Sequence, residues 1–127
     1  MNKVFKIKQS IYPYKFKLAF FISETDVKNI LKKVKIEKAD YNTFLNGTGW
    51  CTRFFNDIGG SIILINKNKC KTYDYFIKVI RHEIQHASAD CFEYICAEDN
   101  DLKKEPFLYL NDFLFSKCLK IGKKEYE

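Results

Sequence analysis

The sequence predicts an α+β domain in which helices pack on a mixed or antiparallel sheet. Apolar residues alternate with lysines over residues 4–20, which is the period of a strand, and recur at helical spacing over residues 23–36. Two longer helical patterns follow at residues 72–96 and 106–121. A length of 127 residues, with 46% hydrophobic and 17% aromatic residues, indicates one ordered domain that spans residues 1–127.

The first elements are expected to be two half-buried strands on either side of Pro13. Apolar and basic residues alternate in both segments: Phe5 and Ile7 with Lys6 and Lys8, then Phe16 and Leu18 with Lys15 and Lys17. One face of each strand should therefore pack in the core, while the other carries a row of lysines.

A surface helix is predicted to follow Ser23. This residue type is a favoured N-cap, and Asp26 stands three positions later, where an acidic side chain completes a capping pattern. The apolar residues that recur at helical spacing are Val27, Ile30, Leu31 and Val34. They form one stripe, so the opposite side of this helix should be charged and exposed.

The middle of the chain predicts a loop and then a hairpin. Residues 40–49 are rich in Asn, Thr and Gly, as loops are. Residues 50–55 and 61–66 are apolar segments on either side of "NDIGG", a turn-like sequence with two glycines. We expect these two segments to form paired strands.

Two helices are predicted to complete the domain. Thr72 can cap a long helix that continues to about Cys96. Pro106 stands where proline is favoured, in the first turn of a final helix. The predicted order is therefore two strands, a helix, a hairpin and two helices.

The net charge of +6 comes almost entirely from lysine, because Arg53 and Arg81 are the only arginines. Lysine supplies point charge without the bidentate fork that reads base edges, so sequence-specific recognition of nucleic acid is not expected. Most of the lysines are interpreted as solvated surface. A DNA-associated protein that binds without sequence preference stays an alternative, and its affinity would fall steeply with salt.

The cysteines do not predict a disulfide framework or a thiolate zinc site. They are odd in number, scattered and without a CxxC pair: Cys51, Cys70, Cys91, Cys96 and Cys118. Buried free thiols in a reducing compartment are the expectation. The start of the chain has no secretory pattern, and the longest apolar runs are too short to cross a bilayer. We therefore expect a soluble, cytoplasmic protein without a membrane partner.

The two histidines of the chain, His82 and His86, stand four residues apart in "VIRHEIQHASAD", with Glu83 after the first. On a helix both rings lie on one face and can bind one metal ion at about 2.0–2.1 Å. Glu83 lies about 100° around the helix, which suits a general base beside a metal-bound water. The alternative is a polar helix face, or a pair of core histidines, without a metal.

Three carboxylates compete to be the third metal ligand. Asp90 and Glu93 lie farther along the same helix axis, and at 1.5 Å per residue Glu93 starts about 10 Å from His86. Glu105 stands at the start of the last helix, after a turn that lets this helix fold back antiparallel on the histidine helix.

"HEIQH" followed downstream by Glu105 resembles the gluzincin pattern, in which HExxH is completed by a glutamate on the next helix. The pair "HEIQHA" and "EPFLYLNDFL" also resembles small phage-encoded zincin-like proteins. The resemblance runs from "SIILIN" through "EPFLYLNDFLF" and implies a small zincin-like single domain, with the HExxH helix and a C-terminal glutamate-bearing helix on the sheet.

The resemblance also implies the roles of individual residues. His82, His86 and Glu105 would bind Zn²⁺, and Glu83 would be the base that activates zinc-bound water. Residues 61–66 would be the sheet strand beside the cleft, where an extended peptide substrate pairs by strand addition.

Two features depart from the family pattern. Thermolysin-like members carry an aspartate four residues after the ligand glutamate, where this chain has Tyr109, so Asp112 is the nearest residue that could orient a histidine. Tyr109 would either donate to the developing oxyanion or pack in the core. These 127 residues also include no counterpart expected for the larger second domain that walls the cleft in these enzymes.

The function implied is a zinc metallopeptidase, or a peptidase-like hydrolase, that acts on a peptide or protein substrate. The alternative is a phage virion or assembly protein that keeps a zincin-like core with a structural metal or none. Its partners would then be phage structural proteins, and it would be found in the host cytoplasm or the virion.

Overall fold

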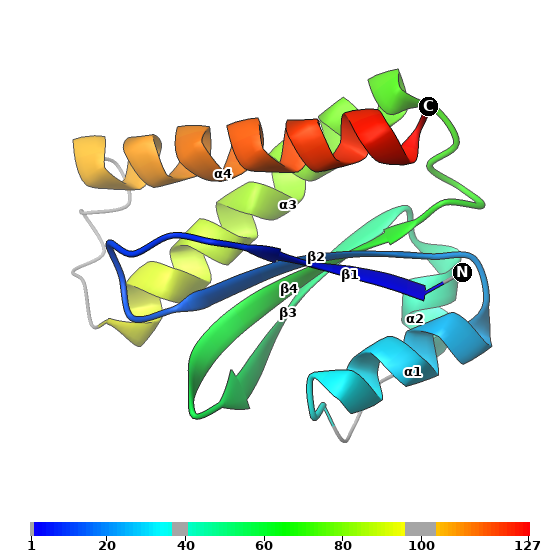
Figure 1. The fold of residues 1–127 in the computed structure, drawn as a ribbon, viewed down its shortest axis with the longest axis horizontal. Coiled ribbons are helices and arrows are strands. Elements are labelled where there is room, and N and C mark those ends of the chain that lie inside the picture. The colour runs from blue at the N-terminus through cyan, green and yellow to red at the C-terminus, as the bar shows by residue number, and fades with distance from the viewer. Residues whose placement is uncertain (1, 37–40, 96–103) are drawn as a thin grey trace.

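The computed structural model describes residues 2–36, 41–95 and 104–127. Within these residues the chain forms strands and helices whose order is shown in Figure 1. They are β1 (Asn2–Ile7), β2 (Lys15–Phe21), α1 (Glu24–Lys33), α2 (Tyr41–Asn46), β3 (Gly49–Asn56), β4 (Ile58–Asn66), α3 (Tyr73–Tyr94) and α4 (Glu105–Glu125).

The four strands form one mixed sheet in the order β1-β2-β4-β3. β1 pairs with β2 and β3 pairs with β4 in antiparallel fashion, whereas β2 and β4 are parallel. The chain between β2 and β4 passes through α1, α2 and β3, which provides the crossover that a parallel pair needs. The predicted α+β class with a mixed sheet is confirmed, and so is the hairpin, in which Arg53 lies opposite Ser61.

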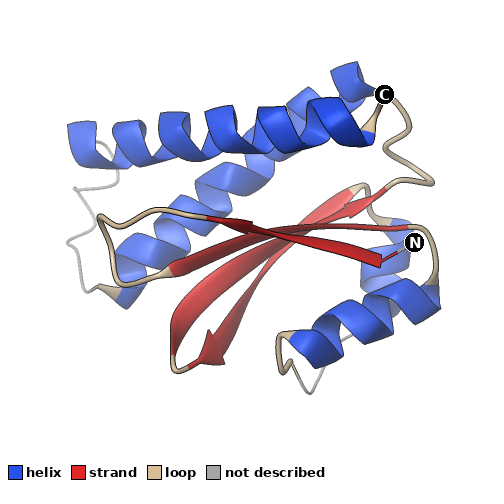
Figure 2. Ribbon diagram, in the orientation of Figure 1, coloured by secondary structure: helices blue, strands red, loops and turns tan. Residues whose placement is uncertain are grey.

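Helices cover both faces of the sheet, as Figure 2 shows. Side chains alternate along β2 and β4, so each strand contributes to two cores. Phe16, Leu18, Phe20, Ile63 and Ile65 pack in the core that includes residues of α3 and α4. Ala19, Phe21, Ile62 and Leu64 pack in the core that includes residues of α1 and α2.

The helix starts follow the capping residues expected from the sequence. Ser23 Oγ accepts a hydrogen bond from the Asp26 amide before α1, and Thr72 Oγ1 accepts one from the Tyr75 amide before α3, each at 3.2 Å. Such caps satisfy amides that have no partner within the helix. The predicted end of α3 at Cys96 lies outside the described residues.

One short helix was not expected. Residues 41–46 form α2, whereas the Asn, Thr and Gly content of residues 40–49 predicted a loop. Phe44 is buried there and meets the Trp50 ring edge-on, with ring centroids 5.8 Å apart. Burial of an aromatic side chain outweighs the weak local propensity of a six-residue segment.

α4 runs antiparallel along α3, as the contacts at both ends show. Near its start, Phe107 packs on Phe92 with ring centroids 5.6 Å apart. Toward its end, the Tyr73 hydroxyl donates to the Leu119 carbonyl at 3.4 Å. Gly122 allows this close approach, because a Cβ at that position would overlap the ring of Phe76.

Four of the cysteines lie in the described part of the chain, and none of these is in a disulfide. Cys70, Cys91 and Cys118 are buried and Cys51 is half-buried, as expected for free thiols. Cys96 lies outside the described residues. No helix in the described ranges combines the length and the apolar character needed to cross a membrane.

Candidate metal centre

α3 brings His82, Glu83 and His86 together. The Nε2 atoms of the two histidines lie 3.1 Å apart, and one ligand atom from each of the three residues lies within 4.8 Å of the others. Two nitrogens bound to one tetrahedral zinc ion at 2.0–2.1 Å would stand about 3.3 Å apart. The donor types and their separation therefore fit two of the ligands of a zinc ion.

The packing of α3 on the sheet explains why the histidines point outward. Phe76, Ile80 and Ala87 lie on the side of α3 that is buried in the core, and at 100° per residue His82 and His86 fall on another side. The His82 side chain is 70% exposed. His86 is also exposed, so solvent has access to both rings.

Glu83 occupies the boundary between this exposed face and the core. Its side chain is only 9% exposed, and its Oε1 lies 3.7 Å from His82 Nε2. Burial raises the pKa of Glu83 above its usual range, while the two nearby histidines lower it in part. The carboxyl group thus holds a proton more tightly than an exposed glutamate does.

The hairpin strand β3 forms the other wall of the centre. A cavity of about 540 Å³ lies between α3 and the start of β3. It is lined by Thr48, Gly49, Trp50, Cys51, His82, Glu83, His86 and Asp90. The three clustered residues therefore face a cavity rather than a flat surface.

Gly49 sets how closely β3 approaches α3 at this point. A Cβ on Gly49 would overlap Cγ1 of Val79 and would lie 3.5 Å from Cγ of Glu83. Sequence reasoning placed Gly49 in a loop and gave it no role. A glycine that directly precedes an apolar strand was the available signal, because it marks a close backbone approach.

β3 is the outer strand of the sheet on the side of the centre. It pairs with β4 alone among the described strands, so no described strand occupies its other edge. The prediction that residues 61–66 are the strand beside the cleft is therefore wrong. These residues belong to β4, which is paired on both sides, by β2 and by β3.

Asp90 joins the last turns of α3 to the sheet. Its Oδ1 accepts a hydrogen bond from Arg53 Nε at 2.8 Å, and its Oδ2 accepts one from Ser61 Oγ at 3.0 Å. The Tyr14 hydroxyl stands 2.5 Å from Ser61 Oγ and is the donor, because the Ser61 proton goes to Asp90. Burial raises the pKa of Tyr14, which keeps this donor protonated.

These hydrogen bonds also show the positions of Asp90 and Glu93, which the sequence offered as metal ligands. Glu93 Oε2 accepts a hydrogen bond of 2.6 Å from Arg53 Nη2, so Glu93 forms an ion pair at the surface. Asp90 lines the cavity of the centre but is not part of the close group formed by the two histidines and Glu83. Arg53, which holds both carboxylates, was not recognised from the sequence.

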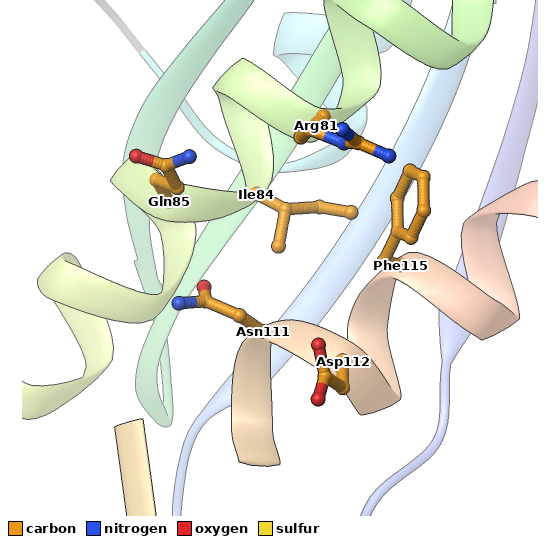
Figure 3. Close-up of a pocket in the computed structure, with 6 residues that line it drawn as sticks. All are labelled: Arg81, Ile84, Gln85, Asn111, Asp112 and Phe115. Carbon is orange, nitrogen blue, oxygen red and sulfur yellow. The ribbon is translucent and has the colours of Figure 1, made fainter. Parts of the chain in front are cut away.

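The α4 residues proposed from the resemblance lie apart from the histidines. Asp112 lines a different cavity, of about 280 Å³, between α3 and α4, together with Arg81 and Gln85 (Figure 3). Arg81 stacks over the ring of Phe115 of α4, with 5.1 Å to the centroid. The side of α3 that meets α4 is thus not the side that carries the histidines.

Glu105 and Tyr109 are also outside the group of clustered ligands. Glu105 is the exposed first residue of α4, and Tyr109 is 67% exposed, so Tyr109 does not pack in the core. Phe107 contacts Phe92, which is six residues, or about 9 Å, beyond His86 along α3. An antiparallel return therefore brings the start of α4 to the end of α3 rather than to the histidines.

Comparisons with protein-family models, with curated proteins and with solved structures find no match to this chain.

Proposed function

We propose that this protein is a zinc-dependent hydrolase that cleaves peptide bonds in an extended peptide or protein substrate. The observation that carries the proposal is the convergence of His82, Glu83 and His86 on one cavity beside a sheet edge that no described strand occupies. The two Nε2 atoms stand 3.1 Å apart, close to the separation expected of two ligands on one zinc ion.

His82 and His86 would hold the metal through their Nε2 atoms. When bound there, zinc would polarise the carbonyl of the substrate and make a water molecule more acidic. Glu105 as a third ligand stays a prediction from the resemblance. It requires the start of α4 to lie closer to the histidines than in this structure.

Glu83 is placed to act as the general base. Its carboxylate is close to His82 but largely buried, so it accepts a proton more readily than an exposed glutamate. A base of this kind takes the proton of the attacking water and then passes it to the leaving amine. Its position on the same helix as both histidines fixes its distance from the reacting atoms.

The edge of β3 that no described strand occupies supports an extended peptide as the substrate. Backbone groups on an unpaired strand edge can pair with a peptide that adds as a further strand. Trp50, which is exposed on β3, and Cys51 line the cavity together with the histidines. A peptide along β3 would therefore pass in front of Glu83.

The exposure of the centre supports catalysis over a purely structural metal. Structural zinc sites are closed by four protein ligands, whereas catalytic sites keep a position for water. Among the described residues, the close group consists of His82, Glu83 and His86, and both histidines are exposed. The alternative of a virion or assembly protein with a structural metal is therefore the weaker one.

Metal content and proteolysis of the Glu83→Gln and His86→Ala variants test the proposal. We expect the purified protein to contain about one zinc ion per chain and to degrade β-casein. Glu83→Gln should retain zinc but lower the cleavage rate by about 100-fold or more. His86→Ala should lose both the metal and the activity.

The matched control is Glu24→Gln, since Glu24 is an exposed glutamate on α1 whose ion pair with Lys28 lies at the surface. It should leave both measurements unchanged. Protein without stoichiometric zinc, or full activity in Glu83→Gln, would contradict the proposal. Zinc binding without any proteolysis, with unfolding of His86→Ala, would favour the structural alternative.

A further inference from the structure

A third cavity, whose residues are distant in sequence from the histidines, lies at the end of the β1–β2 pair. Its volume is about 460 Å³, within the range of small-molecule sites. It is lined by Lys6, Ile7, Lys8, Gln9, Tyr14, Lys15, Phe16 and Lys17. Half of these residues are lysines, and none of these lining residues, all within the described ranges, is acidic. It shares no lining residue with the cavity of the histidines.

The strand register concentrates these lysines. Lys6 lies directly opposite Lys17 in the antiparallel pair, where side chains are about 5 Å apart at Cβ. Lys15 is two residues before Lys17 and so projects from the same face of β2, about 7 Å away. Lys6 and Lys17 carry like charges directly opposite each other, and such a pair repels.

The partial burial of Lys17 makes this repulsion between lysines more costly. Its Nζ lies over the Phe54 ring, 5.0 Å from the centroid. Burial lowers the pKa of Lys17, and the charges of Lys6 and Lys15 lower it further. An anion that entered the cavity would therefore gain from partly desolvated positive charge.

The wall of the cavity is held in place by Gln9. Its Nε2 donates to the carbonyls of Tyr12 at 2.8 Å and Tyr14 at 2.7 Å. Its Oε1 accepts from the amides of Ile11 at 3.0 Å and Tyr12 at 2.9 Å. One side chain thus satisfies four backbone groups of the turn between β1 and β2. The backbone of this turn, on either side of which the lysines stand, is therefore held in place.

We propose that this cavity binds a ligand with several phosphate groups, either an inorganic polyphosphate or the backbone of a nucleic-acid strand. The lining supplies four ammonium groups, which is more positive charge than a single carboxylate would need. Lysine binds phosphate through charge alone, so the binding should be independent of base sequence. This function is separate from that of the histidine centre and does not depend on it.

The experiment measures the affinity of the full chain for two probes, fluorescein-labelled oligo-dT and sodium triphosphate. The test variant is Lys6→Gln/Lys17→Gln. The control is Lys32→Gln/Lys33→Gln, which removes the same charge from exposed positions at the end of α1. At about 50 mM salt we expect the test variant to lose at least tenfold in affinity and the control less than twofold.

The salt dependence provides a second readout. Removing two phosphate contacts should reduce the slope of log affinity against log salt by about 1.4 for a single strand. Displacement of the oligonucleotide by triphosphate would identify the phosphate group itself as the ligand. Binding of the oligonucleotide without such displacement would identify the strand as the ligand.

Three outcomes would overturn the proposal. They are equal losses in the test and control variants, no measurable binding of either probe, and binding of a poly-glutamate peptide as tight as that of the oligonucleotide. The test variant should remain folded, because it removes two repelling charges, and thermal melting checks this. If it does not fold, Lys8→Gln is the substitute, since Lys8 is exposed and lies beyond the end of β1.

Discussion

Arg53 Nε donates a hydrogen bond of 2.8 Å to Asp90 Oδ1, and this contact ties the outer strand β3 to the helix that carries both histidines. The Asp90 side chain is 17% exposed and the Arg53 side chain is 53% exposed. Asp90 is therefore largely shielded from solvent, whereas Arg53 is not. Asp90 also accepts from Ser61, whereas Arg53 reaches solvent and Glu93.

The first prediction follows from this asymmetry. Asp90→Ala should lower the free energy of unfolding by about 1–3 kcal/mol, because it leaves the buried Ser61 hydroxyl, which accepts from Tyr14, without the acceptor for its own proton. Arg53→Gln should cost less than about 1 kcal/mol, as exposed ion pairs do. Urea unfolding of both variants measures this. A larger loss in Arg53→Gln than in Asp90→Ala would disprove the ranking.

The second prediction concerns Glu83 and pH. The pKa of Glu83 is raised by burial, so the folded metal-free protein binds this proton more tightly than the unfolded chain. The resulting stabilisation is present below the unfolded pKa of about 4.5 and is lost as pH rises through the folded pKa. Glu83→Gln should therefore increase the melting temperature at about pH 8 more than at about pH 4.

Thermal melts in the presence of a chelator measure this difference between wild type and Glu83→Gln. Glu24→Gln is the control, since Glu24 lies exposed on the far side of the sheet from α3. The same difference in melting temperature at both pH values would show that Glu83 does not titrate differently in the folded and unfolded states.

The third prediction separates the possible zinc ligands. Glu105 is exposed at the start of α4, which packs at the end of α3, beyond His86. As the structure places it, Glu105→Gln should leave zinc affinity within about twofold, whereas His86→Ala should lower it by 10-fold or more. Competition with a chromophoric chelator gives both constants. A tenfold loss in Glu105→Gln would instead establish the ligand set predicted from the sequence.

The fourth prediction tests how α4 packs. A Cβ at Gly122 would overlap the buried ring of Phe76, so Gly122→Ala should destabilise the fold by about 1–3 kcal/mol. Gly47→Ala is the matched control, because its Cβ would meet only ordinary contacts, 3.5 Å from the Thr43 carbonyl oxygen. Chemical denaturation of the two variants compares them. Equal stability would mean that α3 and α4 are packed less tightly than in this structure.

Features that depend on near neighbours in the chain were predictable from the sequence. The caps at Ser23 and Thr72 act on amides three residues away, and both helices begin where the sequence predicts. The approach of His82 to His86 is equally local, because one helical turn separates them. These predictions required only that the segments be helical.

Features that join distant parts of the chain were not predictable in this way. Glu105 and Asp112 do not meet the histidines, because α4 packs on another side of α3 and begins beyond His86. Contacts between the two helices, such as that of Phe107 with Phe92, set this placement. Likewise, the place of β4 inside the sheet follows from its parallel pairing with β2, which no local pattern reveals. The contact of Arg53 with Asp90 depends on that same topology.

The residues that line the candidate metal centre all come from one continuous stretch of the chain, 48–90. Joining β3, β4 and α3 closes only short loops, and short closures cost little chain entropy. The centre should therefore assemble early, as a local unit of hairpin and helix, before β1 and α4 dock. The rest of the domain would then serve to keep that unit folded, and substitutions there would be tolerated as long as the sheet stays covered.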